Sequence, residues 1–198
     1  MSISDWKAMR NGVAGVALGD PSQRRRVLDA EIKAYQELKS SIHRKLIDRM
    51  DLSTVSQISP DQLSGIIKTV VEALITEVGI PMTRVERERL ILEIQHETLG
   101  LGPLEPLLQD PEISDIMVNG SGQIYIEKHG KLQKTNVTFK DDEHLMTIIE
   151  RIVSKVGRRV DESSPLVDAR LPDGSRVNVI IPPLALDGPA LSIRRFGV

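Results

Sequence analysis

The chain has 198 residues and no cysteine, with 26 Lys and Arg against 28 Asp and Glu and 40% hydrophobic residues. This composition is typical of a globular protein, and the lack of cysteine excludes disulfide frameworks, cysteine nucleophiles and cysteine-based zinc sites. The net charge of −2 argues against a general affinity for nucleic acid. Because no apolar run approaches a membrane span and residues 1–20 carry no export signal, we expect a cytoplasmic protein.

The first hundred residues predict a tail and then helices. Residues 1–19 have too little apolar periodicity to pack, so we expect a flexible tail. Asp20-Pro21 followed by Gln23 is a helix start signal. It opens a long helix with apolar residues at steps of three or four, namely Leu28, Ile32, Tyr35, Leu38, Ile42, Leu46 and Met50.

Two further helices are predicted before residue 101. Ser59-Pro60-Asp61-Gln62 repeats the start signal and opens a helix that ends at Gly79. Thr83 with Glu86 forms another capping box, and the third helix ends at Gly100 with Val85, Leu90, Ile91 and Ile94 expected to face inward. We therefore expect residues 20–100 to form an all-helical domain of three helices.

The second half of the chain carries strand signals. Strands are expected at 113–119, on both sides of His129-Gly130, and at 166–171, 175–181 and 190–196. Asp141 or Asp142 caps one helix that runs to Val156. We expect residues 101–198 to form a PAS-like α/β domain with a mainly antiparallel sheet and this helix on one face, so the fold class is α+β.

Catalytic and metal-binding patterns are absent from the sequence. The histidines His43, His96, His129 and His144 lack the spacing of metal ligands. No Walker A sequence, nucleophile elbow or catalytic triad pattern is present. We therefore expect no metal site and no catalytic residue in this chain.

Arginines remain as candidates for anion binding. Residues 151–198 carry eight Lys or Arg and five acidic residues, and the arginines considered are Arg158, Arg159, Arg170, Arg176, Arg194 and Arg195. Guanidinium groups suit phosphate oxygens, and Arg176 with Arg194 can reach one anion if the sheet brings their strands together. The alternative is that each arginine is solvated or paired with Asp161, Asp168 or Asp173. Sequence spacing does not choose between these two interpretations.

Several segments together resemble a known family. They are LGPLEPLL at 101–108, ISDIMVNG at 113–120, DARLPDGSRVN at 168–178 and LSIRRF at 191–196. In this order they resemble the N-terminal region of the type II/type IV secretion ATPases, and within that superfamily the CpaF-type ATPases of tight-adherence (Flp) pilus assembly. Residues 21–100 resemble the helical domain that precedes this region in CpaF-type members.

The resemblance implies a function that the residues alone do not. Members of the family are hexamers in which a C-terminal RecA-like domain binds ATP with Mg²⁺, and the N-terminal domain packs over the nucleotide. The resemblance implies that Arg176 and Arg194 reach the phosphates, with Arg170 and Arg195 as further candidates and Arg158 and Arg159 divided between phosphate and subunit contacts. We expect this chain, which carries no Walker A motif, not to hydrolyse ATP alone.

Partners follow from the same resemblance, and two alternatives stay open. The expected partner is an inner-membrane platform protein of a pilus or secretion machine, so the protein would be peripheral to the membrane through its partners. The main alternative is a stand-alone PAS-like interaction or sensory module. Nucleic-acid binding through residues 151–198 is disfavoured, because that segment has one aromatic residue and a small basic surplus.

Overall fold

The computed structural model describes residues 21–50 and 59–197. The chain divides into two compact units, Met1–Leu99 and Gly100–Val198. The tail expected at residues 1–19 and the cap expected at Asp20 lie outside the described residues. Within the described ranges, no helix combines the length and the apolar character needed to cross a membrane.

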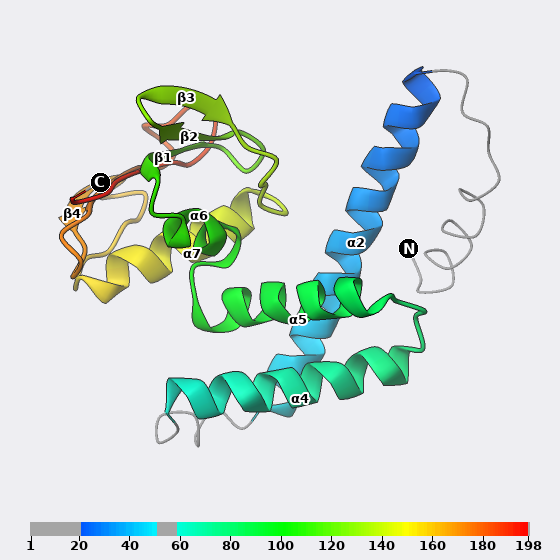
Figure 1. The fold of residues 1–198 in the computed structure, drawn as a ribbon. Coiled ribbons are helices and arrows are strands. Elements are labelled where there is room, and N and C mark those ends of the chain that lie inside the picture. The colour runs from blue at the N-terminus through cyan, green and yellow to red at the C-terminus, as the bar shows by residue number, and fades with distance from the viewer. Residues whose placement is uncertain (1–20, 51–58, 198) are drawn as a thin grey trace. The chain divides into compact units, whose positions relative to one another are not determined.

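The described residues of the first unit form three helices, α2 (Pro21–Arg49), α4 (Pro60–Val78) and α5 (Arg84–Leu99) (Figure 1). The predicted capping box at the start of α4 is confirmed, since Gln62 N donates to the Ser59 side chain and Gln62 reaches back to the Ser59 backbone. Gly79 ends α4 in the left-handed conformation, as expected. At the start of α5, Thr83 N donates to Glu86 Oε2 at 2.7 Å, which confirms the last capping box.

The core of the first unit follows the predicted stripes with two corrections. Its buried residues include Leu38, Ile42, Leu46, Leu63, Ile67, Val71, Leu74, Ile75, Leu90, Ile91 and Ile94. Val85 is 73% exposed, so the expected inward position was wrong. Val85 and Ile94 are nine positions apart, and nine steps of 100° place the two side chains on opposite faces of α5. Ile32 is 49% exposed because it precedes the part of α2 that packs in this core, which begins at Tyr35.

The second unit is an antiparallel sheet with helices, which confirms the α+β class. Two short helical segments, a 3-10 turn at Gly102–Leu104 and α6 (Glu105–Gln109), precede the sheet. The strands are β1 (Ile113–Asn119), β2 (Ile124–Lys128), β3 (Lys131–Lys134), β4 (Leu166–Arg170), β5 (Arg176–Ile180) and β6 (Ala190–Arg194), with α7 (Asp142–Lys155) between β3 and β4. All pairings between the six strands are antiparallel.

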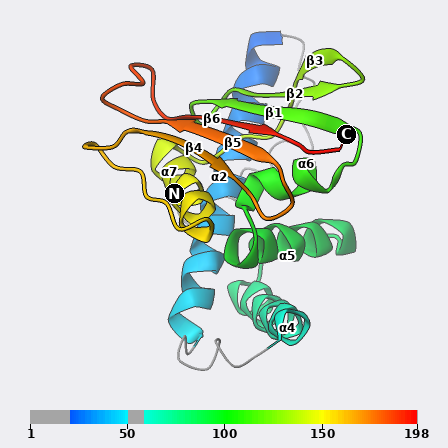
Figure 2. The ribbon, with the colours of Figure 1, turned by 90° about the vertical axis from the view of Figure 1, so that its left-hand side faces the viewer.

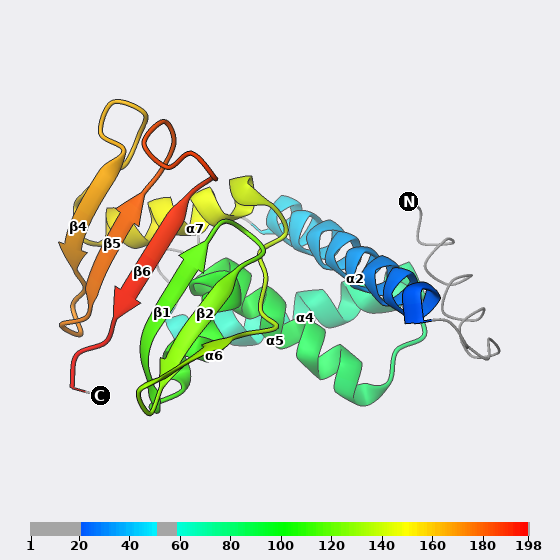
Figure 3. The same cartoon turned by 90° about the horizontal axis from the view of Figure 1, so that it is seen from above.

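The order of the strands in the sheet is β3-β2-β1-β6-β5-β4 (Figure 3). The last strand, β6, therefore lies between the first strand and β5. Helices α6 and α7 lie on the same face of this sheet (Figures 1 and 2). Apolar residues of α7, such as Leu145 and Ile149, pack with strand residues such as Ile116, Val177 and Ile193 in one core. The opposite face of the sheet, which we call the outer face, carries the alternate residues of each strand.

Candidate functional site

The strand register places three of the candidate arginines in one row across the sheet. Arg170 of β4 lies opposite Arg176 of β5, and Arg176 lies opposite Arg194 of β6. Residues directly opposite in an antiparallel sheet point to the same face. We call Arg170, Arg176 and Arg194 the arginine row.

The arginine row belongs to the outer face of the sheet. In β5 and β6 the neighbouring positions Val177 and Ile193 are fully buried in the core, so the arginines beside them point the other way. The Arg176 and Arg194 side chains are 65% and 79% exposed. The row is therefore accessible to an anion in solution.

Arg176 holds a carboxylate of the neighbouring strand. Its Nε donates to Asp168 Oδ1 at 3.1 Å and its Nη2 donates to Asp168 Oδ2 at 2.5 Å. This is the two-pronged geometry in which a guanidinium group binds a carboxylate or a phosphate. Hydrogen bonding to Arg176 holds the pKa of Asp168 below its usual value, and the same contact raises the pKa of Arg176. The pairing with Asp168 that the sequence left open is thus observed.

Arg194 has a looser acidic neighbour. Asp115 of β1 lies directly opposite it, with 3.9 Å between Arg194 Nε and Asp115 Oδ1. This is an ion-pair distance rather than a hydrogen bond. From the edge strand inward, the arginine row thus consists of Arg170, Arg176 and Arg194, and the carboxylate of Asp115 lies next to it near the middle of the sheet.

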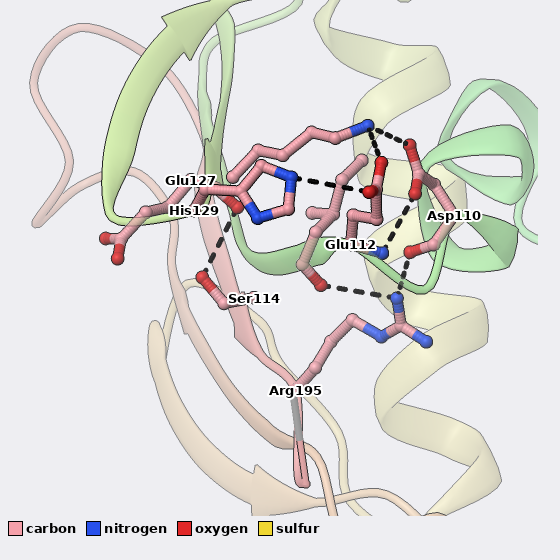
Figure 4. Close-up of polar contacts among 8 residues, drawn as sticks. Asp110, Glu112, Ser114, Glu127, His129 and Arg195 are labelled. Atoms are coloured by element: carbon pink, nitrogen blue, oxygen red, sulfur yellow. Dashed lines mark hydrogen bonds and ion pairs between the residues drawn. The ribbon is translucent and has the colours of Figure 1, made fainter.

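Arg195 lies outside the row and contacts backbone carbonyls. Its Nη1 donates to the Asp110 carbonyl and, at 3.2 Å, to the Ile113 carbonyl (Figure 4). Its backbone N–H donates to the Ser114 carbonyl at 2.8 Å. These contacts connect the end of β6 to the turn before β1 and to the first residues of β1.

The turn before β1 is also stabilised by charged side chains. Lys128 Nζ lies 3.2 Å from Asp110 Oδ2 and 2.5 Å from Glu112 Oε2, and His129 Nε2 lies 3.3 Å from Glu112 Oε1 (Figure 4). The backbone N–H of Glu112, followed by Lys128, lowers the pKa of Asp110. Lys128 lowers the pKa of Glu112. This cluster has its charges matched internally, so it offers an incoming anion less than the arginine row does.

The remaining sequence candidates are not part of the row. Arg158 and Arg159 follow α7 and are exposed. Arg159 Nε lies 3.7 Å from Asp161 Oδ2. Across residues 21–50 and 59–197, the structure brings together no group of three His, Asp or Glu side chains that could hold a metal ion. The guanidinium groups of the arginine row are of a kind that suits phosphate oxygens.

The two acidic residues beside the row were not among the predicted site residues. Asp115 appeared only within the motif at 113–120. Asp168 appeared within the motif at 168–178 and as one of three possible partners of the arginines. A signal for Asp168 was available, since it precedes Arg170 by two residues and shares its face in a strand. For Asp115 no such signal exists, because only the pairing of β1 with β6 brings it to Arg194.

Comparison with known families gives two matches along the chain. Residues 97–197 match the family model described as type II/IV secretion system protein. Residues 35–99 match the model described as the N-terminal domain of type II secretion system protein E. The two matches overlap at residues 97–99, at the end of α5.

Individual relatives agree with the family matches. An uncharacterised protein of Methanocaldococcus jannaschii is 34% identical over 119 residues, which are 59% of this chain and 22% of the relative. The type IV secretion system protein VirB11 of Brucella suis is 31% identical over 96 residues, which are 48% of this chain and 27% of the relative. The chain thus spans less than a third of either relative.

One solved structure is also similar. It is the VirB11 ATPase of the Brucella suis type IV secretion system, with 29% sequence identity and a TM-score of 0.45. The similarity covers 50% of this chain and 31% of that one.

Proposed function

The chain belongs to the type II/IV secretion system protein family, and from this premise we propose that it is the N-terminal region of a hexameric motor ATPase. The resemblance of its motifs to CpaF-type proteins leads us to assign this motor to tight-adherence (Flp) pilus assembly. In this proposal, the helical unit contacts partners and the α/β unit completes the nucleotide site. The nucleotide would be held chiefly by a RecA-like domain of the same protein.

The observation that carries the proposal is the arginine row. Like charges directly opposite each other in a sheet destabilise it, yet Arg176 has an arginine opposite it on both sides. Three guanidinium groups on an exposed face suit a ligand with several negatively charged oxygens, such as a nucleoside triphosphate. This supports a role for Arg176 and Arg194, with Arg170, in neutralising phosphate charge.

The chain's own residues would act by charge and position. When bound, ATP with Mg²⁺ supplies the phosphoryl group whose hydrolysis drives the motor. Charged donors fixed in advance around a phosphoryl group stabilise the charge of its transition state. Arginines on a unit separate from the RecA-like domain would also make the position of that unit depend on the bound phosphates. Arg195, which contacts two backbone carbonyls, would support the row by fixing the end of β6.

The expected partners follow from the same proposal. The hexamer would be formed by copies of the full-length protein, and its partner would be a platform protein of the inner membrane, reached from the cytoplasmic side. Arg158 and Arg159, which are exposed and lie outside the arginine row, remain candidates either for contacts with the phosphates or for contacts between subunits.

Substitution of the row in the full-length protein tests the proposal. Arg176→Ala or Arg194→Ala should lower ATPase activity at least tenfold, since charge placed at a transferring phosphoryl group can contribute on the order of 10³-fold. Folding should survive, because exposed substitutions typically change stability by about 0.5 kcal/mol. Arg194→Lys separates two modes of action: it should stay impaired if the two-pronged geometry matters, and recover activity if charge alone matters.

A matched control uses an exposed arginine of the first unit. Arg84 also pairs with a carboxylate, at 2.8 Å from Glu88, and its side chain is 90% exposed. Arg84→Ala should leave ATPase activity at the parent level. If both row variants form hexamers and hydrolyse ATP at the parent rate, the phosphate role is wrong.

A further inference from the structure

The ion pair between Arg176 and Asp168 occupies the part of the arginine that a phosphate would use. Both carboxylate oxygens of Asp168 accept hydrogen bonds from the guanidinium group, at 3.1 and 2.5 Å. A phosphate that binds the same Nε–Nη2 edge of Arg176 in the two-pronged manner would need the same donors. The two acceptors therefore exclude each other at these N–H groups.

We propose that Asp168 is an internal competitor that holds the Nε–Nη2 edge of Arg176 in the ligand-free protein and must be displaced by any anion that binds the arginine row through this edge. This inference rests on the proposed function, because it assigns a regulatory residue to the same site. Its consequence is quantitative. For an anion that uses this edge, the apparent affinity equals the intrinsic affinity multiplied by the fraction of time during which the edge is free.

The surroundings of the pair allow this exchange. The side chains of Asp168 and Arg176 are 46% and 65% exposed, so water can solvate the carboxylate once it is released. Exposed ion pairs contribute little net stability, so their displacement is not prohibitive. Asp168 also lies on β4, which is an edge strand, and its side chain can turn away from the row without disturbing the core.

The competition would filter ligands by charge. A small monoanion that contacts one guanidinium group replaces one carboxylate by another weak ligand and gains little. A polyphosphate that also reaches Arg170 and Arg194 gains contacts that Asp168 alone does not offer. A polyphosphate would therefore displace Asp168 more readily than a monoanion does.

The experiment measures binding of tripolyphosphate to the 198-residue chain by NMR titration at low ionic strength. Asp168→Asn should bind tripolyphosphate about two- to fivefold more tightly than the parent chain, since an exposed ion pair is worth at most about 1 kcal/mol. The matched control is Asp115→Asn, which removes the same charge from beside the row but only a 3.9 Å contact with Arg194. It should gain less than twofold, because it frees no two-pronged guanidinium.

A double variant links the effect to Arg176. In an Arg176→Ala background, Asp168→Asn should bring no gain in affinity, since the donor for which it competes is gone. The amide spectrum of each variant reports whether the sheet is intact. Asp168→Ser, which also removes the carboxylate, serves as a second variant if Asp168→Asn disturbs the sheet.

The outcomes separate this inference from the function on which it rests. If Arg194→Ala weakens binding but Asp168→Asn binds no more tightly than the parent, Asp168 is not a competitor and the anion role stands. An equal gain in Asp115→Asn also overturns the inference, because a general charge effect would then explain both. If neither the parent nor Asp168→Asn binds tripolyphosphate, the anion role fails and the inference fails with it.

Discussion

The two units differ in whether their charged side chains are buried or exposed. Among the described residues, the charged side chains that are buried, Lys39 and Glu97, both belong to the first unit. Lys39 Nζ lies 3.2 Å from Glu97 Oε1 and 3.5 Å from Glu93 Oε2. In the second unit the charged residues stay at the surface, and the arginine row lies on an exposed face. A buried ion pair fixes a structure, whereas an exposed row can exchange one anionic partner for another.

The largest effect that we expect from this contrast is in the first unit. Lys39→Met should lower the free energy of unfolding of the helical unit by about 3 kcal/mol, because it leaves the buried Glu97 carboxylate without its ammonium neighbour. Thermal and denaturant unfolding followed by circular dichroism at 222 nm, where helices dominate, measures the loss.

A double variant provides the control. Lys39→Met combined with Glu97→Gln removes both charges and should be less destabilised than Lys39→Met alone. If the single variant is as stable as the parent, Lys39 is not part of a stabilising pair and the contrast between the units is lost.

A smaller effect is expected at the turn that joins two strands of the arginine row. Gly174, between β4 and β5, has φ of +87°, and a Cβ there would lie 3.2 Å from Phe196 Cγ. Gly174→Ala should therefore destabilise the second unit by about 1–2 kcal/mol, from the backbone conformation and the contact together. The shift in its thermal transition measures the effect.

The matched control is the glycine of another turn in the same unit. Gly130 also has a positive φ, of +71°, but a Cβ there meets nothing within 4 Å. Gly130→Ala should show the backbone cost alone and therefore the smaller shift. A larger shift at Gly130 than at Gly174 would mean that the contact with Phe196 contributes nothing.

The sequence predicted most of the elements because their signals are local. The capping box at Ser59 and Gln62 lies within four residues, and the turn at His129-Gly130 needs only two residues with positive φ, which are observed at 52° and 71°. Helix α6 was missed, because five residues are too few to show a helical period. Local patterns thus define where an element starts and stops.

The site was less predictable because it depends on strand order. Arg176 and Arg194 are 18 positions apart in the sequence, and they become neighbours only because β6 pairs with β5. The return of β6 to the middle of the sheet also brings Asp115 to the row. Spacing in a sequence does not encode such long-range pairing, so the arginines could be named as candidates but not assembled.

The smallest effect tests whether the two units are independent, as the expected domain boundary near residue 100 implies. Ile67 of α4 and Ile116 of β1 are both fully buried, each in the core of its own unit. Replacing either one by Val removes a single methylene group and should cost about 1 kcal/mol. Scanning calorimetry should show two transitions, and each variant should move only one of them, by roughly 4–8 °C for domains of this size.

The matched pair makes this outcome specific. Both substitutions are the same chemical change at positions with no exposure, so a difference in which transition moves reflects the unit and not the residue. Contacts between domains of one chain are often small enough to permit separate unfolding and relative movement. A single transition that both variants lower by the same amount would show that the units unfold together, and the expectation of two independent domains that meet near residue 100 would be wrong.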